Sequence, residues 1–139
     1  MQTSSNQTPR SNQPEPTAVR SHTRTKRIPG ARRIRAKELP VFSRQLAAMY
    51  SSGIPVVQAL EAAEEQTTVK EFKPVIRSLQ KGIEAGGTLS DSCARYPEIF
   101  DDLFVNMVRA GEAGGILAET LSRMAGFLEA SQRLRSKVK

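Results

Sequence analysis

The stretch DDLFVNMVRAGEAGGILAETLSRMAGFL, residues 101–128, decides the fold of this 139-residue chain. Its apolar residues recur every three or four positions, the spacing that gathers side chains on one face of an α-helix. Glycines at 111–115 interrupt the pattern, and Asp101 or Asp102 can cap the first helix. We therefore predict two amphipathic helices joined by a turn in which glycine adopts a left-handed backbone, the second helix being the longest in the chain.

The same helical periodicity extends from this stretch toward the N-terminus. Amphipathic helices are predicted over Phe42–Tyr50, Pro55–Ala63 and Phe72–Ile83, and a short helix is predicted after Thr88. No window alternates at the two-residue period of a β-strand, so the fold class is all-α, a six-helix antiparallel bundle. The glycine turns expected to fix the helix crossings are Gly53, Gly87, Gly111, Gly114 and Gly115.

The composition of the chain changes at residue 37. Residues 1–37 hold nine Lys or Arg, one Glu and four prolines, whereas all seven aromatic residues of the chain lie later. The net charge of +7 therefore comes entirely from this first segment. A segment so poor in apolar residues buries too little surface to offset its ordering entropy. We predict a disordered, basic, Pro/Ser/Thr-rich tail over 1–37 and one folded domain over 38–139.

The basic tail has two interpretations. It is either a solvated tail that favours solubility, or an electrostatic arm for anionic lipid or nucleic acid. The second interpretation defines an alternative function for the chain, a small helical nucleic-acid-binding protein. The tail offers no aromatic side chain on which bases can stack, which disfavours nucleic acid as the partner.

The residues needed for catalysis are sparse. His22, the only histidine, lies in the tail, so Cys93, the only cysteine, lacks a histidine base and is expected to pack as a small apolar residue. These counts also exclude a zinc site made of His and Cys. Glu98, Asp101 and Asp102 form an acidic group that suits either helix caps or a divalent cation. We predict that the protein is not an enzyme and holds no cofactor.

Glu112 is the unusual carboxylate of the sequence. It lies among glycines at the predicted end of a helix, where the helix dipole disfavours negative charge. Such a position indicates a specific partner for the carboxylate. The partner is either a cation of the same domain, for which Arg44 and Arg109 are candidates, or hydrogen-bond donors on another protein.

Six short motifs follow one another along the second part of the chain. They are FSRQLA at 42–47, SGIP at 52–55, ALE at 59–61, GTLS at 87–90, YPEIF at 96–100 and MVRAGEAGGIL at 107–117. Their order and spacing over about a hundred residues resemble the F domain of the inner-membrane platform proteins of bacterial type II secretion and type IV pilus machines.

The resemblance implies a six-helix bundle in a membrane protein that has two such domains, three membrane helices and no catalytic activity. It implies a platform between a cytoplasmic assembly ATPase and pilin or pseudopilin subunits, alongside other inner-membrane assembly proteins, at the cytoplasmic face of the bacterial inner membrane. A homo-oligomer is left open. The residues expected to contact partners are Arg44, Gln45, Glu61 and Glu112.

This chain departs from the resembled pattern in holding one domain and no membrane helix. Its longest apolar run has five residues, 46–50, too few to cross a bilayer. We expect it to be the N-terminal cytoplasmic part of a longer protein in which a membrane helix follows. Basic residues then form a juxtamembrane flank, in keeping with the positive-inside rule. They are Arg133, Arg135, Lys137 and Lys139.

Overall fold

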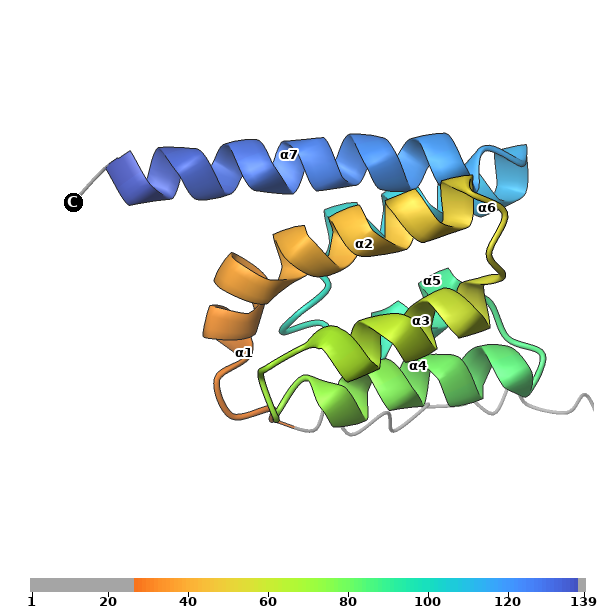
Figure 1. The fold of residues 1–139 in the computed structure, drawn as a ribbon, viewed down its shortest axis with the longest axis horizontal. Helices are drawn as coiled ribbons and strands as arrows, with labels where there is room; N and C mark the ends of the chain where they lie inside the picture. Colours follow the sequence, from red (N-terminus) through yellow and green to blue (C-terminus); the bar gives the residue numbers. More distant parts are fainter. Residues whose placement is uncertain (1–26, 138–139) are drawn as a thin grey trace, which may run out of the picture.

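The computed structural model describes residues 27–137, and within this range the chain forms helices and no strand (Figure 1). The elements are α1 (Ala31–Arg33), the π-helical turn η1 (Ile34–Glu38), α2 (Leu39–Ser51), α3 (Val56–Gln66), α4 (Lys73–Glu84), α5 (Leu89–Ala94), α6 (Asp102–Gly114) and α7 (Leu117–Lys137). Because α1, η1 and α2 follow one another without a break, they make one helix, and the predicted all-α bundle of six helices is confirmed.

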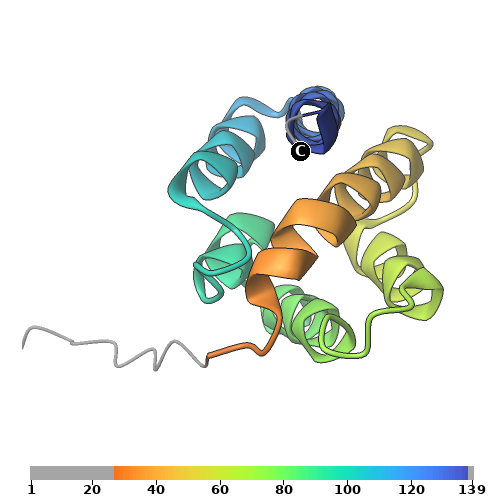
Figure 2. The same ribbon diagram turned by 90° about the vertical axis from the view of Figure 1, so that its left-hand side faces the viewer.

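The helices are arranged around α2. The long helix α7 runs antiparallel to α2 and packs along it, and α6 packs against α7 (Figures 1 and 2). On the other side, α3 packs against α2 and α4, and α5 connects α4 to α6. The first and last helices of the described residues therefore both contact α2, because α2 continues from α1 and η1 and packs against α7.

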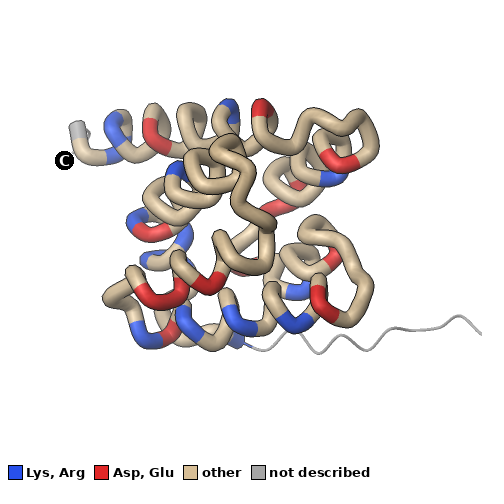
Figure 3. Tube along the Cα trace, turned by 45° about the vertical axis from the view of Figure 1, so that its right-hand side comes forward, with Lys and Arg blue, Asp and Glu red and all other residues tan. Residues whose placement is uncertain are grey.

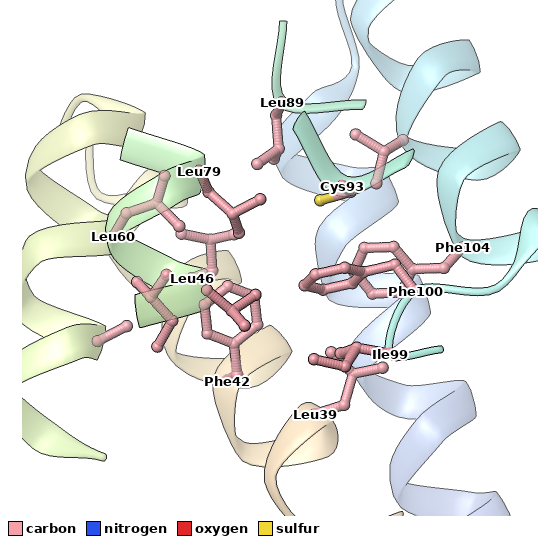
Figure 4. Close-up of a cluster of buried hydrophobic side chains, with 14 of the residues drawn as sticks. Leu39, Phe42, Leu46, Leu60, Leu79, Leu89, Cys93, Ile99, Phe100 and Phe104 are labelled. Carbon is pink, nitrogen blue, oxygen red and sulfur yellow. The ribbon is translucent and has the colours of Figure 1, made fainter. Parts of the chain in front are cut away.

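Four phenylalanines form the centre of the core. The ring centroids of Phe42 and Phe72 lie 5.2 Å apart, those of Phe42 and Phe100 6.3 Å, and those of Phe100 and Phe104 5.0 Å. Figure 4 shows how Leu and Ile side chains from α2, α3 and α4 and from the segment before α6 surround these rings. Edge and tilted contacts of this kind add to the stabilisation from burial alone.

Two helix starts confirm caps expected from the sequence. Thr88 Oγ1 accepts a hydrogen bond from the backbone N–H of Asp91 at 3.1 Å, which caps α5. Asp101 Oδ1 accepts one from the N–H of Phe104 at 2.9 Å, which caps α6. Each bond satisfies an N–H group that the helix itself leaves unpaired.

Three of the predicted turn glycines, Gly53, Gly87 and Gly115, lie in connections between helices. Gly53 and Gly115 have φ angles of 91° and 70°, the left-handed region that glycine enters without a Cβ penalty. After α4 the left-handed residue is Gly86, with φ of 98°, and not Gly87. At Gly87 a Cβ atom would lie 2.9 Å from the carbonyl oxygen of Gly82, so glycine is needed there for a close approach.

Gly111 and Gly114 also differ from the predicted turn, because α6 continues through both of them. Gly111 is buried against α7, where a Cβ atom would lie 2.6 Å from Thr120 Oγ1 and 2.9 Å from Thr120 Cβ. The helix end is displaced to Gly115. Gly111 therefore acts by letting α6 and α7 approach closely, and the left-handed turn needs only Gly115.

The folded part begins earlier than the predicted boundary at residue 38. Ala31 and Ile34 are 8% and 1% exposed and belong to the core, and residues 31–38 are helical. The predicted tail over 1–37 is therefore wrong for residues 31–37, whereas residues 1–26 lie outside the described part. Sequence statistics miss this segment because four Lys or Arg residues separate and follow its two buried apolar residues.

The π-helical turn η1 lies directly before Pro40. Proline has no N–H to donate to the carbonyl oxygen four residues earlier, and its ring clashes with that carbonyl. The wider turn, in which the N–H of Leu39 donates to the oxygen of Ile34, carries the helix past this point without a break. The fold thereby keeps α1 attached to α2.

Candidate partner surface

Arg44, predicted to contact a partner, makes an ion pair within the domain. Its Nη2 lies 2.5 Å from Oε1 of Glu129 on α7, and its Nε donates to Oε2 at 3.4 Å. The hydrogen bond and the charge of Arg44 lower the pKa of the Glu129 carboxyl. Both side chains are partly exposed, so water screens the pair and its contribution to stability is small. The pair fixes how α2 lies along α7.

Gln45 borders a depression between α2 and α3, whereas Glu61 lies outside it. Gln45 Nε2 donates to Oε1 of Gln66 at the end of α3, and Glu61 is exposed on the same helix. The depression measures about 250 Å³, and its lining includes Gln45, Gln66 and Val41, whose side chain is 52% exposed. An exposed aliphatic side chain among polar groups is typical of the edge of a protein–protein contact.

Glu112 contacts neither of the cations proposed for it. Its Oε2 accepts a hydrogen bond at 3.3 Å from the backbone N–H of Ser90, in the first turn of α5. Arg44 pairs with Glu129, and Arg109 pairs with Asp91 at 3.2 Å. The predicted pairing of Glu112 with Arg44 or Arg109 is therefore wrong, and the carboxylate instead connects α6 to the start of α5.

Cys93 lies beneath this connection and is 1% exposed. Burial raises the pKa of its thiol, and the negative charge of Glu112 raises it further. The thiol therefore stays protonated at neutral pH and is a poor nucleophile. Its expected packing as a small apolar residue is confirmed.

Two residues of the predicted acidic group each accept a hydrogen bond from a backbone N–H. Asp101 caps α6, and Oε2 of Glu98 accepts a hydrogen bond from the N–H of Ile28 at 3.3 Å. Across residues 27–137, no three His, Cys, Asp or Glu side chains come together in a group suited to a metal ion. The interpretation of these residues as caps is confirmed for Asp101.

Glu64 on α3 holds a second polar cluster together. Burial alone would raise the pKa of its carboxyl, but hydrogen bonds from Gln80 and Arg77 and the nearby charge of Lys73 lower it. Arg77 Nη2 lies 2.7 Å and Gln80 Nε2 lies 2.8 Å from this carboxylate. The cluster ties α3 to α4, so the polar faces of this bundle are largely joined by side chains from neighbouring helices.

The chain has clear relatives among known proteins. A family model described as type II secretion system (T2SS), protein F, matches residues 42–139. The chain is 39% identical over 112 residues to the type IV pilus assembly protein PilC of Myxococcus xanthus, an alignment that covers 81% of this chain and 27% of that protein. It is 38% identical over 107 residues to the type II secretion system protein F of Vibrio cholerae, covering 77% of this chain and 26% of that one.

This chain belongs to the type II secretion system protein F family. It spans about a quarter of the length of the curated relatives that it matches. Within residues 27–137 of this family member, no helix is both long enough and apolar enough to cross a bilayer. The resemblance read from the six motifs is therefore confirmed at the level of the family.

The basic flank of this F-family chain is partly described. Arg133 and Arg135 are exposed near the end of α7. Lys137 ends α7, but its side chain and the whole of Lys139 lie outside the described residues. The structure adds three polar residues that the sequence did not single out, namely Glu129, Gln66 and Thr120. Glu129 and Gln66 pair with Arg44 and Gln45 on α2, whereas Thr120 donates to the carbonyl oxygen of Ile116 and lies against Gly111 of α6.

Proposed function

We propose that this chain is a non-catalytic scaffold domain of the inner-membrane platform of a type IV pilus or type II secretion machine. Its role is to couple a cytoplasmic assembly ATPase to the assembly of pilin or pseudopilin. The observation that carries the proposal is the family match over residues 42–139, together with relatives named for pilus assembly and type II secretion.

The structure supports a scaffold role over an enzymatic one. The thiol of Cys93 is buried and protonated, and the carboxylates of Glu112, Glu64 and Asp101 are each engaged by neighbouring groups. The contacts of Glu112 and Glu64 join helices to one another, and that of Asp101 caps α6. A bundle tied in this way transmits force between its faces without large internal rearrangement, which is what a coupling element requires.

We place the ATPase contact on the face formed by α2 and α3. Val41 is exposed there beside Gln45 and the depression between the two helices, and Glu61 is exposed elsewhere on α3. Arg44 borders this face and orients it through Glu129 on α7. We assign Glu112 a positioning role and not a partner contact, because its carboxylate connects α6 to α5.

Titration calorimetry of the full chain against the matching assembly ATPase, with and without nucleotide, tests this proposal. The unchanged chain is expected to bind in the micromolar range, roughly −8 kcal/mol, as transient polar contacts do. The double variant Val41→Ser, Glu61→Lys is expected to lose at least about tenfold in affinity, the equivalent of ~1.4 kcal/mol.

A matched control carries a charge reversal on another face, Glu119→Lys in the first turn of α7. This variant is expected to bind as the unchanged chain does. Absence of measurable heat for the unchanged chain at high micromolar concentration contradicts direct contact with the ATPase. Equal losses in both variants contradict the placement on α2 and α3.

A further inference from the structure

We propose that the end of the bundle formed by α1, η1 and the last turns of α7 binds the surface of an anionic phospholipid bilayer. The proposal rests on the placement at the inner membrane given above, and goes beyond it by assigning lipid contact to the folded domain itself. We name this surface the basic end. Its cationic residues are Arg32, Arg33, Arg35 and Lys37 from α1 and η1, and Arg133 and Arg135 from α7.

The basic end is assembled by the fold from two segments a hundred residues apart. Arg35 and Arg135 line one groove of about 180 Å³, so the two segments share a surface. Figure 3 shows Lys and Arg positions near the end of α7 and on the N-terminal turns below it, with further Lys and Arg positions along the lower helices. Charges that are separate in sequence therefore act on a ligand together.

The cations of the basic end are turned to solvent. Arg32, Arg33, Lys37, Arg133 and Arg135 are exposed and Arg35 is partly exposed. The ion pairs found among residues 27–137 involve other arginines, Arg44, Arg77 and Arg109. Guanidinium groups bind phosphate through paired N–H donors, and clustered Lys and Arg attract anionic leaflets.

The same groove has apolar as well as polar lining. Leu39, Ile99, Phe104 and Phe127 line it together with the two arginines and Asp101, and of these four apolar residues only Phe127 is exposed. Phe127 is 56% exposed and also lines a small neighbouring hollow with Leu103, which is 53% exposed. Apolar side chains next to the cations give lipid tails and glycerol a place to contact once phosphate is bound.

Leu134 extends this apolar strip along α7. It is 67% exposed and lies seven residues, about two helical turns, after Phe127, which places both on one face of the helix. Arg133 and Arg135 flank it. Basic residues around exposed Phe and Leu are the composition of helices that lie in the bilayer interface, whereas nucleic-acid surfaces do not need the apolar strip.

Co-sedimentation of the full chain with vesicles tests whether the cations of the basic end contribute to lipid binding. The probe is phosphatidylglycerol mixed into phosphatidylcholine, compared with phosphatidylcholine alone. The unchanged chain is expected to sediment only with the anionic vesicles. The variant Arg32→Glu, Arg35→Glu, Arg135→Glu is expected to lose at least about tenfold in partition coefficient, since each cation near an anionic surface contributes.

The matched control reverses three exposed charges on other faces, Lys70→Glu, Lys81→Glu and Arg95→Glu, and has the same net charge. It is expected to retain binding within about twofold of the unchanged chain. Equal losses in the two variants overturn the proposal, because net charge alone would then explain binding. Circular dichroism checks folding, and Arg→Gln at the same three positions replaces the reversals if the first variant unfolds.

The basic residues before the described part are tested separately, by Arg10→Gln, Arg20→Gln, Arg24→Gln and Lys26→Gln in the full chain. Loss of all vesicle binding here, with none lost in the basic-end variant, overturns the proposal. Duplex DNA serves as a second ligand. If the basic-end variant loses affinity for DNA and keeps its affinity for vesicles, the surface is a nucleic-acid site and the proposal is wrong.

The apolar strip is tested by fluorescence, because the chain contains no tryptophan. Phe127→Trp places the only indole at the basic end, and Val41→Trp places it on the α2–α3 face. The emission maximum is expected to shift to the blue on anionic vesicles for Phe127→Trp and to stay unchanged for Val41→Trp. A shift in neither, or an equal shift in both, overturns insertion at the basic end. The ATPase calorimetry uses Val41 and Glu61, so the two proposals fail independently.

Discussion

Glu112 at the end of α6 and Glu61 on α3 both belong to the motifs that carry the family resemblance. Glu112 is partly buried and accepts a hydrogen bond from the backbone of α5, whereas Glu61 is exposed on the surface of α3. This division between residues that hold helices together and residues that face solvent runs through the α2–α3 region as well, where Arg44 pairs with Glu129 of α7. A motif residue is therefore not by itself a contact residue, and its burial decides between the two roles.

The largest effect on stability is expected for a buried motif residue. Phe100 closes the YPEIF motif, is 1% exposed and packs against Phe42 and Phe104. Phe100→Ala should lower the free energy of unfolding by about 3–5 kcal/mol, since it removes the ring and leaves a cavity. Urea denaturation followed by circular dichroism measures the change. A loss below about 1 kcal/mol would show that the motif does not anchor the core.

The next effect concerns the close approach of α6 to α7. Gly111→Ala should destabilise the chain by about 1–3 kcal/mol, because the new Cβ overlaps Thr120. Gly114→Ala in the same helix is the control, since its Cβ would lie 3.6 Å from the nearest atom, Ile116 Cγ1, and alanine favours helices. Thermal denaturation compares the two. If both substitutions stabilise the chain, α6 and α7 do not pack closely at Gly111.

A smaller effect is expected for the connection between α6 and α5. Glu112→Ala should cost about 1 kcal/mol, because the N–H of Ser90 loses its acceptor. Glu112→Gln keeps an oxygen acceptor and should cost less. Urea denaturation of the two variants measures both changes. An equal loss of stability in Glu112→Ala and Glu112→Gln would contradict the role of this carboxylate as the acceptor for Ser90.

The smallest effect is expected on the exposed side, for the pair of Arg44 with Glu129. The pKa of Glu129 is lowered in the folded chain, so the pair stabilises it above the ordinary pKa of glutamate. This contribution is lost as the pH falls through the lowered folded-state pKa. Glu129→Gln should therefore destabilise the chain slightly at neutral pH and leave its stability unchanged in acid, as measured by urea denaturation at the two pH values. Added salt should shrink the difference at neutral pH.

Local signals predicted much of this fold. The stripe from Phe72 to Ile83 and the caps at Thr88 and Asp101 depend on neighbours within a few residues, and the structure contains all of them. Gly111 was misassigned because glycine suits both a turn and a tight helix crossing, and only the position of Thr120 distinguishes the two.

The candidate site was less predictable than the fold. Arg44 pairs with Glu129, which lies 85 residues later in the sequence. Glu112 accepts its hydrogen bond from the backbone N–H of Ser90, 22 residues earlier. Residues so far apart in the sequence form no periodic pattern from which their pairing could be predicted. The helix over residues 31–38 was missed for another reason, because its two buried residues stand among cations that resemble a solvated tail.

The π-helical turn over Ile34–Glu38 also sets the angular phase of everything before it. Each residue of an α-helix advances the direction of a side chain by about 100°, so the one extra residue in this turn rotates α1 by that amount about the helix axis. Ile34 points into the core and Arg32 and Arg33 point outward in this phase. If residues 34–38 formed a regular α-helix with no residue removed, Ile34 would turn by about 100° away from the core, so the wide turn sets which side chains of α1 face the core and which form the charged end of the molecule.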